Sequence, residues 1–329
     1  MRAPAFWSRP IAFWLAPLLW PISAIYGALT LRRMARPGWR APVPVISIGN
    51  FTAGGAGKTP TALALARALI DRGERPAFIT RGYGGTITGP HRVDPAHDNP
   101  RMTGDEPLLL VRLAPTYVSR NRAAGARLAI SEGATCLLLD DALQNPAVQK
   151  DLSIAVVDGS AGFGNGHVVP AGPLRAPFEA QLAHADLVLV IGEDRADVAA
   201  RVGGRKPVLA AQIVPDGKNL AGTDIIAFSG IALPEKFQRS LEACGAHVLD
   251  RIDFADHHTF SDAEAAALLE RAAKSGAKLV TTEKDHVRLA GSPMLEKLAA
   301  ASLTLPIRLE PDAALYEAAY RTLAASRSR

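Results

Sequence analysis

The feature that most constrains this chain is a glycine-rich turn between a short β-branched run and an alanine-rich stretch. The run at 43–48 reads VPVISI, the turn at 49–60 reads GNFTAGGAGKTP, and TALALARALIDRG follows. Glycines let backbone N–H groups wrap a phosphate, and the N-terminus of the next helix adds its positive end. Lys58 is then placed to reach the β- and γ-phosphates, and Thr59 to hold Mg²⁺. The pattern predicts a buried parallel strand, a nucleotide-binding loop and a helix, in that order.

The loop departs from the strict phosphate-loop pattern at one position. Gly-x-x-x-x-Gly-Lys-[Ser/Thr] requires glycine at position 52, where this chain has Thr52. ATPases of the partition type carry a lysine just before the paired glycines, and Ala53 at that place argues against this class. A glycine-rich turn with a chance lysine is the alternative interpretation. The residues expected to contact the nucleotide are Thr52, Ala53, Gly54, Gly55, Ala56, Gly57, Lys58 and Thr59.

A second motif suggests a metal site. Residues 134–141 read ATCLLLDD, an apolar strand that ends in two aspartates. Parallel strands deliver such carboxylates to the carboxyl edge of the sheet, where phosphate-loop enzymes bind their metal. We therefore expect Asp140 or Asp141 to hold Mg²⁺, directly or through water, together with Thr59. The other aspartate is expected to cap the next turn.

The alternation of apolar runs and helical stretches continues along the chain and indicates an α/β fold with mostly parallel strands. The 329 residues, 48% hydrophobic and 21% charged, suffice for one large or two modest domains and exclude wholesale disorder. Breakers at 202–204 and 215–217 place a boundary near residues 200–220. We expect an N-terminal segment at 1–40, a P-loop NTPase-like α/β/α sandwich at 41–210, and a smaller C-terminal α/β lobe at 211–329.

Cysteine usage limits the class of protein further. The two cysteines, Cys136 and Cys244, exclude a disulfide scaffold and a multi-cysteine zinc or iron–sulfur site. Cys136 lies in the apolar run before the two aspartates and is expected to be a buried, reduced thiol. This usage suits the cytosol best.

The excess of positive charge is confined to the N-terminal segment. Residues 1–40 contain six arginines and no acid, whereas the net charge of the whole chain is +5. All four tryptophans lie at or before Trp39, and residues 11–31 carry no charge. Aromatic residues beside arginines favour a bilayer surface, whereas a nucleic-acid binder would spread basic residues over a folded face. We therefore expect membrane contact and no nucleic-acid partner.

Three structures are compatible with this segment. The favoured one is a monotopic, interfacial helix pair, in which Phe6, Phe13 and Trp20 recur every seven residues. A single span is the second, since the uncharged run is long enough to cross a bilayer and membrane helices tolerate Pro17 and Pro21. A buried core helix is the third. If the segment spans, the arginines that follow it would keep the bulk of the protein in the cytoplasm.

Several motifs, in order along the chain, together resemble the tetraacyldisaccharide 4'-kinases, the lipid A 4'-kinases of Gram-negative bacteria. No motif apart from the phosphate loop is decisive alone, but the ordered set covers roughly residues 5–315 and is specific. The matching stretches are 49–60, Arg81–Gly85, Gly104–Pro107, Asp140–Asp141 with Gln144, Pro170–Arg175, Phe228–Ala232, Asp256–Phe260 and Thr281–Asp285.

The resemblance implies a reaction. In that family ATP, with Mg²⁺, phosphorylates the 4'-hydroxyl of a tetra-acylated glucosamine disaccharide 1-phosphate at the cytoplasmic face of the inner membrane. A lipid with four acyl chains leaves the bilayer only at high cost, about 0.8 kcal/mol per buried CH₂. The enzyme must therefore go to the lipid, which agrees with a peripheral or monotopic N-terminus. No obligate protein partner is evident.

The resemblance also implies a base for the attacking hydroxyl. Asp105 matches the family's aspartate, and its partner is a histidine of the 256–260 stretch, with His257 the first choice and His258 the second. A base of this type contributes about 10²- to 10⁴-fold to the rate. The alternatives are an N-cap role for Asp105 and, for the histidines, a polar turn before a helix capped by Ser261.

Two loops are expected near the phosphates. Arg81 and Tyr83 lie among glycines after the strand PAFIT, where an arginine can pair with a phosphate; a solvated turn is the alternative. Arg175, in a proline- and glycine-rich loop, is expected to stabilise the transferring γ-phosphoryl group. The family often has glutamate at the next position, where this chain has Ala176, so any role of that glutamate is absent or moved.

Two further stretches complete the candidate site. The resemblance implies a place for Gln144 near the nucleotide, although the family's Asp-Asp-Gly-Phe-Gln-His reads Asp-Asp-Ala-Leu-Gln-Asn here. Asn145 thus replaces a histidine, which weakens any wider role for this loop. Lys284 and Asp285 follow the strand KLVTT and are expected to read the nucleotide base, to close the cleft, or to form a structural ion pair.

Two other functions are compatible with the residues. One is a soluble small-molecule kinase or ligase, in which the N-terminal segment would be part of the core. The other is a nucleotide-switched membrane-binding protein with no acceptor substrate. For the kinase interpretation we expect an active site between the two lobes, because Asp105 and His257 come from different halves of the chain, and closure of the lobes on ATP.

Overall fold

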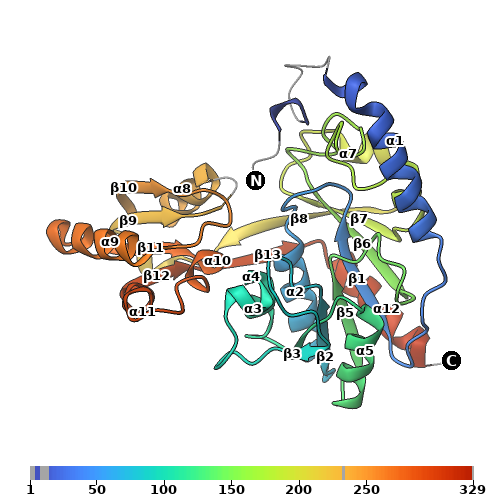
Figure 1. Cartoon of the computed structure of the whole chain (residues 1–329), viewed down its shortest axis with the longest axis horizontal. Helices are drawn as coiled ribbons and strands as arrows, with labels where there is room; N and C mark the ends of the chain where they lie inside the picture. Colours follow the sequence, from blue (N-terminus) through green and yellow to red (C-terminus); the bar gives the residue numbers. More distant parts are fainter. Residues whose placement is uncertain (1–3, 8–14, 232–233, 328–329) are drawn as a thin grey trace.

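The computed structural model describes residues 4–7, 15–231 and 234–327, and its α/β architecture confirms the predicted fold class. Two sheets form two lobes, and Figure 1 shows the smaller lobe projecting to one side of the larger. Within the described residues the strands of the large sheet are, in spatial order, β13 (Ile307–Pro311), β8 (Val208–Pro215), β7 (Leu187–Ile191), β6 (Leu152–Asp158), β1 (Val45–Asn50), β5 (Cys136–Asp140), β2 (Pro76–Thr80), β4 (Thr116–Val118) and β3 (His91–Arg92).

The centre of the large sheet places the predicted motifs at one edge. Every residue of β1 is buried, as expected of a parallel strand covered on both faces. β1 pairs in parallel with β5 and β6, and Ile48 lies opposite Asp140. Because both strands run in the same direction, the phosphate loop and the two aspartates leave the sheet at the same edge.

Helices cover both faces of the large sheet. Leu65 and Leu69 of one helix and Leu315 of another pack on the face formed by residues such as Ile46. The helices on this face are α2 (Lys58–Ile70) and α12 (Ala313–Arg327), and those on the opposite face are α5 (Arg122–Ser131), α6 (Phe178–Ala183) and α7 (Val198–Val202). Two short helices, α3 (Pro100–Thr103) and α4 (Asp105–Leu110), follow one another, and α4 contacts both α2 and the second lobe.

The second lobe is a smaller parallel sheet with its own core. Its strands, in spatial order, are β10 (His247–Asp253), β9 (Asp224–Ser229), β11 (Lys278–Thr282) and β12 (Ser302–Leu305). One face packs on α8 (Pro234–Ala243), and the other packs on α9 (Asp262–Ser275) and α11 (Pro293–Ala301). The short helix α10 (Glu283–His286) follows β11, and the 3₁₀ helix η2 (Lys218–Leu220) precedes β9.

The expected division at residue 211 needs correction. β8 continues to Pro215 within the large sheet and pairs in antiparallel fashion with β13, with Leu309 opposite Ile213. The chain thus leaves the large lobe through β8 and returns to it through β13, as Figure 1 shows, and α12 then packs on α2. Residues 211–215 and 307–327 therefore belong to the large lobe. The return strand escaped the sequence analysis because it is a short, largely exposed edge strand rather than a buried apolar run.

The N-terminal segment contains the 3₁₀ helix η1 (Ala5–Trp7) and one α-helix, α1 (Leu15–Met34). α1 has 20 residues, and the expected helix pair falls in part on residues 8–14, which lie outside the described residues. Arg2, Arg9, Phe13 and Trp14 lie outside the described residues. Among the helices that are described, none combines the length and the apolar character needed to cross a bilayer.

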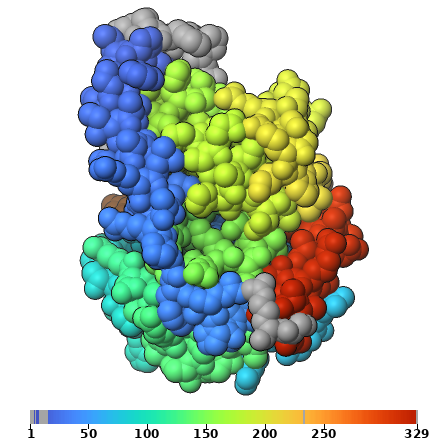
Figure 2. All heavy atoms as spheres, turned by 90° about the vertical axis from the view of Figure 1, so that its right-hand side faces the viewer, coloured from blue at the N-terminus to red at the C-terminus, as the bar shows by residue number. Residues whose placement is uncertain are grey.

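The alternative that α1 is a core helix is wrong. Leu18 is 69% exposed and Ile25 is 65% exposed, and Figure 2 shows α1 running along the outside of the molecule. Small residues form its contact side: the backbone N–H of Ala171 donates to Oγ of Ser23 at 3.0 Å, and Gly27 faces Pro177. The helix therefore lies against the large lobe by a narrow stripe and leaves a broad apolar side uncovered.

Candidate active site

The phosphate loop surrounds open space. A Cβ atom added at Gly54 or Gly55 would meet no atom within 4 Å, so this part of the loop faces solvent rather than packed side chains. Gly57, at the N-cap of α2, has φ of 91°, which L side chains rarely adopt. Lys58 Nζ lies 3.4 Å from the Gly54 carbonyl oxygen and 3.6 Å from Asp141 Oδ1. The loop thus has room for phosphate oxygens and a cation directed at them.

Three residues of the predicted nucleotide site already have partners within the protein. The Ala53 N–H donates to the Pro173 carbonyl at 2.7 Å, so it is not free to bind a phosphate as expected. Thr52 forms a β-bridge with Leu174. The Gln144 side-chain amide donates to the Asn50 carbonyl at 2.7 Å and to Gln181 at 2.5 Å. These contacts support the phosphate loop from the protein side, where residues 173–174 pack against it. The N–H groups from Gly54 onward remain as candidates for phosphate binding.

The two aspartates after β5 meet the requirements of a cation site. Oδ2 of Asp140 accepts from the Thr80 hydroxyl at 3.2 Å, but Oδ1 of Asp140 and Oδ1 of Asp141 are buried without a hydrogen-bond donor. Burial, with the nearby carboxylates of Glu106 and Asp141, raises the pKa of Asp140 above its usual range. Burial likewise raises the pKa of Asp141, but Lys58 and Arg175 outweigh it and lower the pKa to about 2. The unsatisfied oxygens are the kind that a divalent cation would satisfy.

A bound metal would need ligands beyond these carboxylates. The described part of the chain holds no group of three or more histidine, cysteine, aspartate or glutamate side chains arranged for a metal. Mg²⁺ is usually held by one or two carboxylates, with phosphate oxygens and waters completing six ligands. The Oδ1 atoms of Asp140 and Asp141, which have no hydrogen-bond donor among the described residues, therefore fit a magnesium ion carried in with a nucleotide. Thr59, the second residue of α2, stays a predicted ligand.

Arg175 lies where the phosphate loop and the aspartates meet. Its Nη1 donates to Asp141 Oδ2 at 2.7 Å and its Nε donates to the Thr52 carbonyl at 3.0 Å. Its backbone N–H donates to the Phe51 carbonyl at 2.9 Å. The structure thus brings together Arg175, Lys58 and Asp141, although they lie in three separate stretches of sequence. The buried methyl of Ala176 next to it offers no ligand, as the sequence indicated.

Asp105 and His257 are in contact across the two lobes. Asp105 is the first residue of α4, and its Oδ2 lies 3.1 Å from His257 Nδ1. The preceding Gly104 approaches the Arg81–Gly85 loop so closely that an added Cβ would lie 2.3 Å from the Tyr83 carbonyl. Burial raises the pKa of Asp105, but hydrogen bonds from His257 and Arg288 outweigh it and lower the pKa to about 2. Asp105 is therefore ionised and is bonded to His257 and Arg288 of the second lobe. It makes no N-cap hydrogen bond at the start of α4.

The second-choice histidine has another partner. His258 Nε2 lies 3.0 Å from Glu264 Oε1, and its ring stacks on Phe254. Glu264 is also the reciprocal partner of Ser261 in the capping box of α9. The expected polar turn before a capped helix thus exists, but it uses His258, whereas His257 has φ of 58° and is directed to Asp105.

Lys284 and Asp285 have different environments. Lys284 Nζ lies 3.3 Å from His257 Nε2, which places it at the contact between the lobes. Asp285 is fully buried and accepts from the Gly230 N–H, the Thr282 hydroxyl and Arg288. Asp285 therefore forms a structural ion pair, with Arg288 as its partner. For Lys284, reading of the nucleotide base and closure of the cleft stay predictions.

The model of the family tetraacyldisaccharide-1-P 4'-kinase, LpxK, matches residues 15–324. The chain belongs to this family. It is therefore a kinase, an ATP-binding transferase of lipid A biosynthesis, that acts on a lipid disaccharide. This settles the choice between the kinase interpretation and a binding protein without an acceptor.

Relatives of the kinase match over nearly its whole length. It is 52% identical to the tetraacyldisaccharide 4'-kinase of Methylobacterium nodulans, covering 97% of this chain and 95% of that protein. The corresponding protein of Bradyrhizobium sp. is 48% identical, covering 100% and 97%. A crystal structure of LpxK from Aquifex aeolicus in complex with ATP has a TM-score of 0.75 and 24% identity, covering 94% of this chain and 99% of that one. This last similarity supports the fold.

Two arginines that the sequence analysis missed lie at the candidate site or at a cavity next to the Arg81–Gly85 loop. Arg288 bonds to Asp105 at 2.6 Å from a position 183 residues away in sequence, and no local motif marks it. Arg120 lines a cavity of about 260 Å³ together with Arg81 and the loop Gly82–Gly85. The predicted Arg81 and Tyr83 are both exposed, Tyr83 to 77%. Two arginines and a glycine-rich backbone make this cavity suitable for an anionic ligand.

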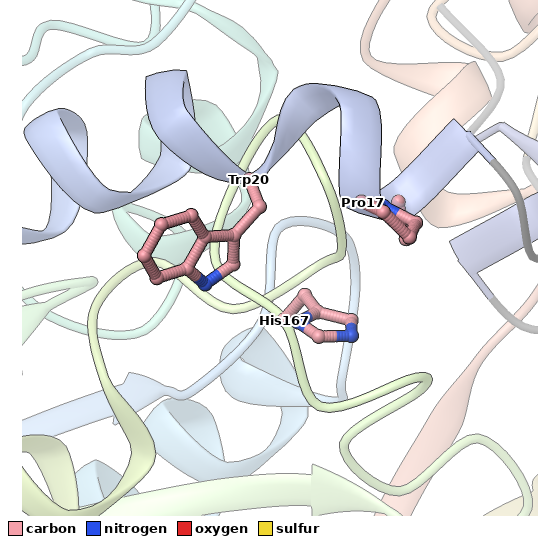
Figure 3. Close-up of a pocket in the computed structure, with 4 residues that line it drawn as sticks. Pro17, Trp20 and His167 are labelled. Atoms are coloured by element: carbon pink, nitrogen blue, oxygen red, sulfur yellow. The ribbon is translucent and has the colours of Figure 1, made fainter.

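A second cavity in the kinase lies between α1 and the loop that leads to Arg175. It measures about 330 Å³ and is lined by Ala16, Pro17, Trp20 and His167. Figure 3 shows Trp20 and Pro17 on the helix and His167 on the facing loop. In the same loop the Pro173 carbonyl accepts from the Ala53 N–H, and the Ala171 N–H donates to Ser23 of α1. The helix α1 and the phosphate loop therefore contact one common segment.

The depressed pKa of Asp105 predicts a pH-dependent contribution to stability. A carboxylate whose pKa falls from 3.8 to about 2 on folding stabilises the kinase above pH 4, by about 2 kcal/mol, and loses this as pH falls through 2. Asp105→Asn should therefore lower the free energy of unfolding by about 2 kcal/mol more at pH 7 than at pH 2, with roughly half of this difference gone by pH 3. Urea unfolding of both proteins across this pH range measures the effect. A difference that does not change with pH would contradict the ion-pair assignment.

Proposed function

We propose that the kinase transfers the γ-phosphoryl group of ATP, with Mg²⁺, to the 4'-hydroxyl of a tetra-acylated glucosamine disaccharide 1-phosphate at the cytoplasmic face of the inner membrane. The observation that carries this proposal is the contact of Asp105 with His257 across the two lobes. Asp105 begins α4, which contacts α2, the helix after the phosphate loop. The match to the family and to its members supports an acylated disaccharide as the substrate class. The ATP present in the Aquifex aeolicus structure is in keeping with the donor.

The acceptor hydroxyl needs a base. Carboxylates accept only, so His257 carries its proton on Nδ1 toward Asp105 and leaves Nε2 as an acceptor. The hydroxyl proton is proposed to pass to this pair as the oxygen attacks the γ-phosphorus and the bond from that phosphorus to the β,γ-bridging oxygen breaks, which releases ADP. Asp105 would stabilise the charge that develops on the imidazole. The low pKa of Asp105 suits that role, because the carboxylate stays ionised at neutral pH.

The transferring group needs neutralisation of its charge. Lys58 is proposed to leave Asp141 for the phosphates, and Arg175 is proposed to contact the γ-phosphoryl oxygens. Thr59, Asp140 and Asp141 would hold Mg²⁺, which when bound would supply positive charge to offset the negative charge of the phosphates. The N–H groups of the phosphate loop orient the chain of phosphates toward the acceptor.

The uncovered side of α1 supports membrane contact. Its exposed apolar side chains are Leu18, Trp20, Ile22, Ile25, Tyr26, Leu29 and Leu31. Arg32 and Arg33 follow in its last turn, where they can contact anionic headgroups. An apolar stripe ending in basic residues is typical of a helix that lies at the bilayer interface. The cavity beside Trp20 opens next to this surface and is suited to an acyl chain of the substrate.

The test of this function is an assay with the proposed substrate. The kinase, ATP and Mg²⁺ are incubated in detergent with the lipid disaccharide 1-phosphate, and the mass of the product is measured by mass spectrometry. We expect a gain of one phosphate on the acylated disaccharide and none on the same disaccharide without acyl chains. Equal transfer to both would favour the soluble small-molecule kinase. Chelation of Mg²⁺ should stop the transfer, and undiminished transfer would remove the metal from the proposal.

Membrane contact predicts a defined loss of binding. Replacing Leu18, Ile25 and Leu29 by serine should lower partition into anionic vesicles by at least about tenfold, since each full-length side chain contributes on the order of 1 kcal/mol when buried in lipid. The folded state should be little affected, because all three are exposed by 60% or more. Leu249→Ser, at a 55% exposed leucine of the second lobe, is the matched control. Unchanged co-sedimentation of the triple variant would contradict the role of α1.

A further inference from the structure

Arg288 follows α10 in the second lobe, and only 4% of its side chain is exposed. Its Nε and Nη2 donate to Asp105 Oδ2 at 2.8 and 2.6 Å. Its Nη1 donates to Asp285 at 2.6 Å and to the Gly230 carbonyl at 3.0 Å. Burying a guanidinium costs free energy unless its donors have acceptors. Here the acceptors are Asp105 of the large lobe and Asp285 and the Gly230 carbonyl of the second lobe.

These contacts fix the orientation of the Asp105 carboxylate. Oδ2 accepts from Arg288 and from His257, whereas Oδ1 has no hydrogen-bond partner in the ranges that the structure describes. A planar guanidinium with two nitrogens on one oxygen restricts the carboxylate more than a single ammonium would. Oδ1 is therefore held in one direction and left free to accept a hydrogen bond.

The same cluster fixes the proton of His257. Because Nδ1 donates to Asp105, Nε2 is the acceptor, and Lys284 Nζ, a donor, lies 3.3 Å from Nε2. Asp105 thus selects the tautomer of His257, and Arg288 bonds to the same carboxylate oxygen, Oδ2, that His257 contacts. Arg288 itself approaches His257 Nδ1 only to 3.3 Å, which is a contact between two donors and not a hydrogen bond in this tautomer.

We propose that Arg288 is a positioning residue for phosphoryl transfer: it holds Asp105 so that the carboxylate orients His257 and presents Oδ1 to the acceptor hydroxyl. This inference rests on the proposed base role of Asp105 and His257. Removing the guanidinium leaves Asp105 free to rotate and leaves Asp285 as a buried carboxylate without its cation. A displacement of a reacting group by about 1 Å costs on the order of 10²-fold in rate.

Kinetics of three arginine variants test the proposal. Arg288→Gln should lower kcat by about 10²-fold and change the KM for ATP by no more than about threefold, because the phosphate loop is untouched. Arg288→Lys keeps the charge but cannot reach Asp105, Asp285 and Gly230 together, so we expect a loss of about tenfold in kcat. Arg271→Gln, which removes a 58% exposed arginine 2.6 Å from Asp250 of the same lobe, should leave kcat unchanged.

Asp105→Asn and His257→Ala, assayed in parallel, separate this inference from the function on which it rests. If both retain full kcat, the base pair is wrong and the role of Arg288 is overturned with it. If both lose kcat while the two Arg288 variants stay within about twofold of the parent, the positioning role alone is overturned. A rise in the KM for ATP that matches the fall in kcat also overturns it. If thermal unfolding shows that Arg288→Gln does not fold, Arg288→Lys decides by the same criteria.

Discussion

Lys58→Met is expected to reduce phosphoryl transfer by about 10³-fold, because it removes a cation directed at the phosphates while keeping a side chain of similar length. Lys58 Nζ lies 3.4 Å from the Gly54 carbonyl and 3.6 Å from Asp141, and only 10% of the side chain is exposed. A charge whose side chain is so little exposed acts more strongly on the phosphoryl group in the transition state than a fully solvated charge would. Steady-state kinetics with the lipid acceptor measure the loss in kcat/KM.

A matched lysine controls for the loss of a positive charge. Lys274, on α9 of the second lobe, is 73% exposed and pairs with Glu270 one helical turn away. Lys274→Met should leave kcat/KM unchanged, because a surface ion pair contributes little to stability and this one is remote from the loop. If Lys58→Met stayed within about tenfold of the parent, the loop would not be the phosphate site.

Asp105→Ala and His257→Ala are each expected to lower kcat by about 10²- to 10⁴-fold, because each removes half of the proposed base. The affinity for ATP should change little, since neither residue belongs to the phosphate loop. The double variant should be no slower than the slower single variant, because residues that act as one unit lose their effect together. Kinetics with the lipid acceptor and direct measurement of ATP binding distinguish these outcomes.

His258→Ala is the internal control for this pair. His258 is adjacent to His257 in sequence but bonds to Glu264 at the start of α9, so its loss should lower stability while kcat stays within about tenfold of the parent. A larger fall in kcat for His258→Ala than for His257→Ala would reverse the assignment. A loss of ATP binding in Asp105→Ala would contradict the role given to that carboxylate.

Local patterns were sufficient to predict the centre of the large lobe. The strand predicted at 43–48 is found at Val45–Asn50, and the helix predicted after residue 60 begins already at Lys58. The apolar strand before Asp140 is found as Cys136–Asp140. These stretches carry their own signals of burial, turn and charge. Cys136 is buried as expected, and burial raises the pKa of its thiol to about 12. The contact of Asp105 with His257, by contrast, followed from the family resemblance and from no pattern in either stretch.

The remaining features depend on contacts distant in sequence. Arg288 could not be predicted because its partner Asp105 lies 183 residues earlier, and arginine in a polar stretch is ordinarily a surface residue. The return of β13 to the large sheet could not be predicted because an exposed edge strand has weak periodicity. The occupied N–H of Ala53 depends on the packing of the 173–175 loop against it, which the sequence of the phosphate loop does not contain.

The most direct test is a structure of the complex with a non-hydrolysable ATP analogue, Mg²⁺ and the lipid disaccharide 1-phosphate. We expect the analogue's phosphates within the 54–59 loop and the free 4'-hydroxyl within about 3 Å of Asp105 or His257, facing the γ-phosphorus. A hydroxyl bound away from both residues, or phosphates held elsewhere than at Lys58, would contradict the account.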